Sequence, residues 1–210
     1  MLSTDAATGK AVPAKEHYDL LIGEGDDPVL DPPVLREYMN GWDGEAFMEA
    51  LGDMAGYRVL EIGVGTGRLA LRVMERGCAS FTGMDLSERV LAAAHGHLAD
   101  YGGIVLMQGE FPAEAPAGPF ERIYSSLTFM HIEDKRAACR KIAALLAPGG
   151  RCVLSLDKDQ SGLIDMGARH VVVWPDNPET ISAYFSEAGL RVAPIKATER
   201  AWLIIAEQIG

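Results

Sequence analysis

VLEIGVGTGRLALRV, residues 59–73, joins a short apolar run to helix-favouring residues through glycines at positions 63, 65 and 67. An apolar run that ends in a glycine turn and continues as a helix is typical of a β-α unit in a parallel sheet. Glycine in such a turn allows positive φ angles and lets the backbone approach a ligand closely. The stretch therefore predicts a small-molecule site, and we compare it with three ligand-binding patterns.

Two of these patterns are incomplete in this sequence. The dinucleotide fingerprint G-x-G-x-x-G, started at Gly63, requires its third glycine where the sequence has Arg68. The P-loop G-x-x-x-x-G-K-[ST] requires a second glycine five positions after the first, and the two positions in question hold Arg68 and Ala70. A nicotinamide dinucleotide is therefore a weak alternative, and nucleotide triphosphate hydrolysis is excluded.

The third pattern, E-x-G-x-G-x-G, is complete, because Glu61 is followed by Gly63, Gly65 and Gly67. On these residues the sequence resembles the class I, Rossmann-like, S-adenosylmethionine-dependent methyltransferases. Their cofactor carries a cationic amino group and a sulfonium and has no pyrophosphate, so an acidic residue at the strand end suits it and would repel a dinucleotide. The resemblance implies S-adenosylmethionine as cofactor and S-adenosylhomocysteine as product.

The resemblance extends over roughly residues 57–156. Asp85, in MDLS, stands where the family places an acid that accepts hydrogen bonds from both ribose hydroxyls. QGEF matches the segment that frames adenine, although Glu110 replaces the aspartate of many members. Tyr18 resembles a tyrosine that touches the methionine end of the cofactor, although it could equally be a core anchor. The implied cofactor contacts are Tyr18, Glu61, Gly63, Gly65, Gly67, Asp85, Leu86, Gly109, Glu110, Phe111 and Ser126.

Strand-like and helix-like segments alternate from Tyr57 onward, which is typical of β-α-β units. With the resemblance, this predicts an α/β fold: a three-layer Rossmann-like sandwich whose seven-stranded, mostly parallel sheet has the order 3-2-1-4-5-7-6, strand 7 antiparallel. We expect residues 1–16 to form a flexible tail, 17–56 an N-terminal helical cap and 57–210 the cofactor-binding domain. Residues 158–178 exceed an ordinary β-α loop in length, which indicates a binding role.

Composition restricts the partners. The formal net charge is −11 and the basic residues are scattered, so bulk nucleic acid is not an expected partner. No apolar run approaches the ~20 residues of a membrane span, and the first residues lack a secretory signal, so we expect a cytoplasmic protein without membrane contact. Cys78, Cys139 and Cys152 form no C-x-x-C pair and are expected to be reduced thiols. No metal site is predicted, and a monomer or homodimer is expected.

The acceptor is restricted by motifs that the sequence lacks. Methyl transfer from a sulfonium mainly requires alignment of the nucleophile, so it imposes few catalytic side chains. Family members that methylate exocyclic or amide nitrogens carry an Asn/Asp-Pro-Pro-Tyr motif after strand four, where this chain has SSLT, residues 125–128. Cytosine-C5 enzymes use a Pro-Cys nucleophile, which none of the three cysteines matches. We therefore expect a small-molecule acceptor with an O, N, S or C nucleophile, as in the family's small-molecule branch.

The acceptor should lie beyond the carboxyl ends of the strands. His131 could accept a proton there, or it could simply pack at a helix start. Arg169 could bind an acceptor carboxylate, or it could be a solvated loop charge. Trp174 precedes Pro175 and could instead pin the loop. The candidate catalytic base is His131, and the candidate acceptor contacts are Tyr18, Phe129, Arg169, His170 and Trp174.

Two further interpretations stay open. A protein that binds the cofactor without catalysis, as a sensor or partner subunit, would keep the same acidic and glycine positions. A nicotinamide-dependent oxidoreductase is the weaker alternative, because only two glycines of its fingerprint are present. Titration with NADH and with S-adenosylmethionine would separate these interpretations.

Overall fold

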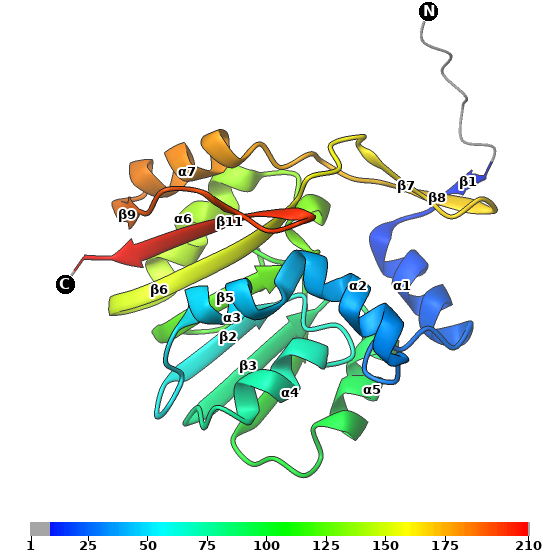
Figure 1. Ribbon diagram of the computed structural model, residues 1–210, viewed down its shortest axis with the longest axis horizontal. Coiled ribbons are helices and arrows are strands. Elements are labelled where there is room, and N and C mark those ends of the chain that lie inside the picture. Colours follow the sequence, from blue (N-terminus) through cyan, green and yellow to red (C-terminus); the bar gives the residue numbers. More distant parts are fainter. Residues whose placement is uncertain (1–8, 210) are drawn as a thin grey trace, which may run out of the picture.

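The computed structural model describes residues 9–209, and an eight-stranded sheet forms its centre (Figure 1). The strand order is β10-β11-β6-β5-β2-β3-β4, with β9 also paired to β11. The strands are β2 (Arg58–Ile62), β3 (Ser80–Asp85), β4 (Ile104–Gln108), β5 (Phe120–Ser126), β6 (Leu146–Asp157), β9 (Leu190–Val192), β10 (Lys196–Ala197) and β11 (Ala201–Gln208).

The predicted α/β class and mostly parallel sheet are confirmed, whereas the strand count differs. Strands β4-β3-β2-β5-β6 are parallel neighbours, and β11 runs antiparallel to β6, as predicted for strand 7. The predicted sixth strand is split into β9 and β10, which pair with opposite ends of β11. Pro194 lies between the two pieces, and proline has no N–H to donate to a ladder.

Helices cover both faces of the sheet because consecutive strand residues point to opposite faces. Val59 packs in one apolar cluster with α3 (Glu45–Leu51) and α4 (Arg68–Met74), whereas the next residue, Leu60, packs in another with α6 (Lys135–Leu145) and α7 (Pro178–Glu187). Helix α5 (Glu88–His97) joins the first cluster through Leu91. This gives the predicted three layers (Figure 1).

The N-terminal segment is more structured than predicted. The tail expected for residues 1–16 is wrong from residue 10 onward, because Lys10–Ala11 form β1 and α1 spans Ala14–Gly23; residues 1–8 lie outside the described part. Helices α2 (Pro33–Asp43) and α3 fall within the range 17–56 assigned to the cap, and α1 begins three residues before it. However, α3 packs in the core rather than over the strand ends, because its apolar side chains, such as Phe47, are fully buried.

The long segment after β6 forms a hairpin. Strand β7 (Leu163–Asp165) pairs antiparallel with β8 (Arg169–Val172), and β8 pairs parallel with β1, giving a second, three-stranded sheet beside α1 (Figure 1). Residues 158–178 thus contain two short strands, β7 and β8. Within residues 9–209, no helix has the length and apolar character needed to cross a membrane.

Candidate functional site

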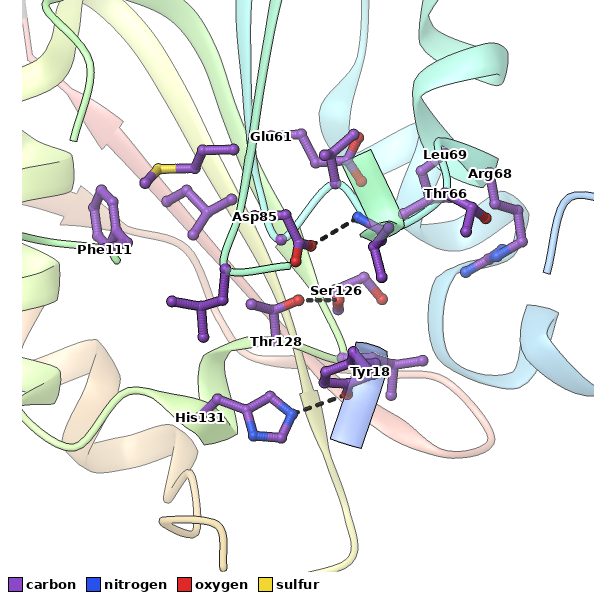
Figure 2. Close-up of a pocket in the computed structure, with 18 of the residues that line it drawn as sticks. Tyr18, Glu61, Thr66, Arg68, Leu69, Asp85, Phe111, Ser126, Thr128 and His131 are labelled. Atoms are coloured by element: carbon purple, nitrogen blue, oxygen red, sulfur yellow. Dashed lines mark hydrogen bonds between the residues drawn. The ribbon is translucent and has the colours of Figure 1, made fainter. Parts of the chain in front are cut away.

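A cleft of about 1160 Å³, open mouth included, lies at the carboxyl ends of β2, β3, β4 and β5 (Figure 2). This is where parallel α/β sheets bind ligands. Residues that follow these four strands form most of the wall, and α1 and α2 add Tyr18 and Met39. The lining residues are Tyr18, Pro28, Met39, Glu61–Thr66, Arg68, Leu69, Met84–Leu86, Val90, Gly109–Phe111, Ser126–Thr128, His131 and Ile132.

The glycine loop requires glycine at its first position. Gly63 has φ of +78°, and a Cβ atom added there would lie 2.0 Å from Oγ1 of Thr128. The loop thus passes so close to the segment after β5 that no side chain fits between them. Gly67, also in the left-handed region, precedes the first residue of α4 and is not among the lining residues, unlike Gly63 and Gly65.

Asp85 stands at the end of β3 and lines the cleft. Its two carboxylate oxygens accept hydrogen bonds from the backbone N–H groups of Gly65 and Ser87, each at 3.0 Å. Burial raises the pKa of this carboxyl, and these N–H donors oppose the rise by stabilising the charged form. The contacts fix the carboxylate between the glycine loop and the start of α5, the place predicted for a ribose acid.

Glu61 is the penultimate residue of β2; it lines the cleft and is 3 % exposed. The hydroxyl of Tyr124, on the neighbouring strand β5, donates a hydrogen bond to its Oε2 at 2.8 Å. Burial raises the pKa of Glu61 well above its ordinary value, and Tyr124 and the nearby Arg68 act in the opposite direction. The predicted acid is therefore at the cleft, with a tyrosine partner that no motif indicated.

Residues after β4 form the predicted adenine end of the cleft. Gly109, Glu110 and Phe111 all line it, together with Leu86. The backbone N–H of Glu110 donates to Oε2 of Glu114 at 2.8 Å, which fixes the loop. The predicted QGEF contacts are thus brought together at the same cleft as Asp85.

A buried charged pair, missed from the sequence, closes another part of the wall. Asp43, at the end of α2, is fully buried and accepts hydrogen bonds from Nη1 and Nη2 of Arg68 at 2.9 and 2.6 Å. The hydroxyl of Ser126 also donates to Asp43, at 2.6 Å. These residues are 25 and 83 positions from Asp43, so no local sequence signal indicates the cluster.

Tyr18 and His131 meet at the cleft. The Tyr18 hydroxyl and Nε2 of His131 are 2.9 Å apart, and both residues line the cavity (Figure 2). Burial lowers the pKa of His131 to about 4, with smaller contributions from His17 and Lys135, so its ring is neutral at neutral pH. Burial also raises the pKa of Tyr18. A neutral phenol therefore faces a neutral imidazole, and the tautomer of the ring decides which of the two donates the hydrogen bond.

The remaining predicted acceptor contacts do not line the cleft. Phe129 is 1 % exposed and belongs to the core beneath α6. Arg169 donates to both carboxylate oxygens of Glu24 at 2.7 Å and to Nδ1 of His17 at 3.2 Å, so it fastens β8 to α1. His170 lies beside it on β8, and Trp174 is 37 % exposed, its backbone N–H bonded to the carbonyl of Met130.

Helix α1 and the loop after it are fastened to the sheet domain at further points. Oδ1 of Asp19 accepts a hydrogen bond from the hydroxyl of Ser87 at 2.5 Å, at the start of α5. Oδ2 of Asp27 lies 2.7 Å from Nε2 of His97, at the end of α5. The side chain of Tyr18 is thus held over the cleft by contacts on both sides of its helix.

Comparison with known proteins identifies the family. A family model described as a methyltransferase domain matches residues 59–150. An uncharacterized methyltransferase of Geobacillus kaustophilus is 34 % identical over 143 residues, 67 % of this chain and 61 % of the relative. A ubiquinone biosynthesis O-methyltransferase of Pseudomonas aeruginosa is 30 % identical over 158 residues, 68 % of each chain. The match thus spans 61 % of the length of the first relative and 68 % of the second.

Solved structures agree in fold. The N-methyltransferase NodS of Bradyrhizobium japonicum, in complex with S-adenosylhomocysteine, superposes with a TM-score of 0.69 at 22 % identity, covering 91 % of this chain and 97 % of that one. The magnesium protoporphyrin IX methyltransferase of Synechocystis gives 0.69 at 18 % identity, covering 93 % and 94 %. The chain belongs to the class I S-adenosylmethionine-dependent methyltransferases.

The cleft fits this family's cofactor. Two acids, Asp85 and the buried Glu61, line the same cavity, and a Cβ at Gly63 would already collide with the facing segment. The glycine backbone and Glu61 suit an aminoacyl group with a cationic amine, and Gly109–Phe111 suit an adenine ring. No residue pattern for a pyrophosphate is present at this loop.

Proposed function

We propose that this protein transfers the methyl group of S-adenosylmethionine to a small-molecule acceptor that lies beside Tyr18 and His131. The observation that carries the proposal is the Tyr18–His131 pair itself, which lies across the cleft from Glu61 in the view of Figure 2. A neutral imidazole and a tyrosine hydroxyl thus lie next to the predicted place of the aminoacyl and sulfonium end. The names of the Pseudomonas relative and of the Synechocystis structure refer to small molecules, ubiquinone and magnesium protoporphyrin IX.

The bound cofactor would supply an electrophilic methyl group, and the chain supplies alignment and a proton acceptor. Asp85 and the glycine loop would hold the ribose and aminoacyl parts, while Tyr18 orients the ring of His131. Because the pKa of His131 is about 4, its ring is available to accept a proton at neutral pH but is a weak base. This favours an acceptor whose proton becomes acidic as it is methylated, such as an amine or an activated hydroxyl.

The test is a methyl-donor turnover screen against a metabolite library with product mass as the readout, followed by His131→Ala and Tyr18→Phe variants. We expect His131→Ala to lose turnover while the affinity for S-adenosylhomocysteine stays at the wild-type level. Tyr18→Phe should lose less turnover than His131→Ala, because it removes the hydrogen bond that orients His131 but keeps the imidazole ring. Unchanged turnover in His131→Ala would refute the proton-acceptor role.

Other interpretations have distinct outcomes in the same experiments. A non-catalytic sensor would bind S-adenosylhomocysteine and give no product with any metabolite. An oxidoreductase would bind NADH in preference, which the residues at the glycine loop do not favour. A cytoplasmic location, a monomer or homodimer, the absence of bulk nucleic acid as a partner, and the division at residues 17–56 and 57–210 remain predictions.

A further inference from the structure

Asp43 is an ionisable side chain with no exposed surface, at the point where the cap helix α2 ends. A buried charge is tolerated when it is paired and hydrogen-bonded. Here both oxygens of Asp43 are used, one by Nη1 of Arg68 and the other by Nη2 of Arg68 and the hydroxyl of Ser126. Such a bidentate pair fixes the plane of the guanidinium as well as its position.

Arg68 has further donors to offer. A guanidinium has five N–H donors, and the hydrogen bonds of Arg68 within the described residues use two of them, both to Asp43. The side chain of Arg68 lines the cleft and is 18 % exposed. Figure 2 shows it reaching down from the start of α4, on the same side of the cleft as Thr66. Its remaining N–H groups are therefore available to a ligand.

The charged residues that line the cleft are mainly acids, so a ligand with a carboxylate has few cationic partners there. The lining residues include the acids Glu61, Asp85 and Glu110, and Arg68 is the only lysine or arginine among the described ones. The aminoacyl group of S-adenosylmethionine carries a carboxylate, which a cationic side chain beside it would stabilise through charge-assisted hydrogen bonds. Arg68 follows the glycine loop directly, in position to supply that charge.

We propose that Arg68 binds the carboxylate of the cofactor's aminoacyl group, and that Asp43 is the positioning residue that orients its guanidinium. This inference rests on S-adenosylmethionine as the cofactor of the proposed function. Because Asp43 belongs to α2 and Ser126 ends β5, the cofactor's carboxylate would be linked to both the cap and the sheet. The arrangement makes the cap helix part of the cofactor site.

The test compares two ligands that differ only in the group concerned. S-adenosylhomocysteine carries the aminoacyl group, and 5′-methylthioadenosine keeps the adenosine and the thioether without it. By calorimetric titration of the full chain, Arg68→Gln should weaken S-adenosylhomocysteine binding about 10- to 100-fold, as expected for loss of charge-assisted hydrogen bonds. The affinity for 5′-methylthioadenosine should stay unchanged. Arg68→Lys should fall between Arg68→Gln and wild type, because it keeps the charge and loses the planar fork.

Arg72 provides a matched control. It stands one helical turn further along α4 and donates to the backbone carbonyl of Asp43 at 3.2 Å, but it does not line the cleft. Arg72→Gln should leave both affinities at the wild-type level. Asp43→Asn should, like Arg68→Gln, weaken the binding of S-adenosylhomocysteine more than that of 5′-methylthioadenosine. A merely structural role of Asp43 would weaken the binding of both ligands equally.

The possible outcomes are distinct. Equal losses for both ligands in Arg68→Gln, or no loss for either, would overturn the assignment of Arg68. A selective loss in Arg72→Gln as large as that in Arg68→Gln would overturn it as well, because the effect would then not depend on the cleft. Failure of the wild-type chain to bind S-adenosylhomocysteine would refute the cofactor itself, which separates the two conclusions.

Discussion

Substitution of Gly63 by alanine tests the close approach that defines the glycine loop. The residue has φ of +78°, a region that costs an L-residue about 1–2 kcal/mol. The added Cβ would also lie 2.0, 2.4 and 2.6 Å from Oγ1, Cγ2 and Cβ of Thr128. Overpacking of this kind typically costs about 1–3 kcal/mol. We therefore expect Gly63→Ala to lower the free energy of unfolding by about 2–5 kcal/mol.

Gly77 provides a control for the conformational cost of placing an alanine at positive φ. It has the same φ of +78°, and an added Cβ there would meet no atom within 4 Å. Gly77→Ala should therefore cost only the conformational part, about 1–2 kcal/mol. For a chain of this size, each kcal/mol shifts the melting temperature by roughly 2–4 °C. Urea denaturation and thermal melting of the two variants, side by side, measure the difference.

The steric part can be removed separately. In a Thr128→Gly background the three colliding atoms are absent, so Gly63→Ala should then cost no more than Gly77→Ala does in the wild type. The coupling between the two positions should equal the missing steric energy, about 1–3 kcal/mol. If Gly63→Ala costs the same as Gly77→Ala, or if Thr128→Gly brings no relief, the contact between the glycine loop and the segment after β5 is refuted.

Three further predictions concern charged groups. Glu61 has a raised pKa, so the wild type should lose stability as the pH rises from its ordinary value of 4.5 toward neutrality; Glu61→Gln should flatten this loss in urea titrations at several pH values. His131 has a pKa lowered from 6.5 to about 4, so stability should fall by about 3 kcal/mol as the pH drops through this window, and His131→Gln should abolish that part of the fall. Arg169→Gln should leave both turnover and S-adenosylhomocysteine affinity unchanged, since Arg169 pairs with Glu24 outside the cleft; a selective rise in the acceptor KM would show instead that Arg169 binds the acceptor.

The cofactor side of the cleft was predictable because its signals are local. Glu61 and the three glycines lie within seven consecutive residues, and a strand, a turn and a helix fix their relative positions. Asp85 follows from the next strand, since the carboxyl ends of neighbouring parallel strands meet at one edge. The parallel order of the sheet follows from the same β-α alternation.

Other features depend on contacts between distant residues, and the sequence carries no local signal for these. Tyr124 lies 63 positions from Glu61, and nothing in ERIYSS indicates that its hydroxyl reaches that acid. Arg169 was predicted to be either an acceptor contact or a solvated loop charge, because its partner, Glu24, is 145 positions away. Strand β1 has two residues, too few to show any periodicity, so its pairing with β8 was missed and the tail was extended too far.

The residues that line the cleft come partly from the shared methyltransferase domain and partly from the cap. The methyltransferase-domain match covers residues 59–150, which include the glycine loop, Asp85 and His131. Tyr18, Pro28 and Met39, which complete the cleft from the cap, lie outside it. The cap contributes an aromatic ring, a proline and a thioether, and a polarizable, flexible methionine adapts readily to ligands of different shape. We therefore expect the choice of acceptor to depend mainly on α1, α2 and the loop between them, and the chemistry of methyl donation on the shared domain.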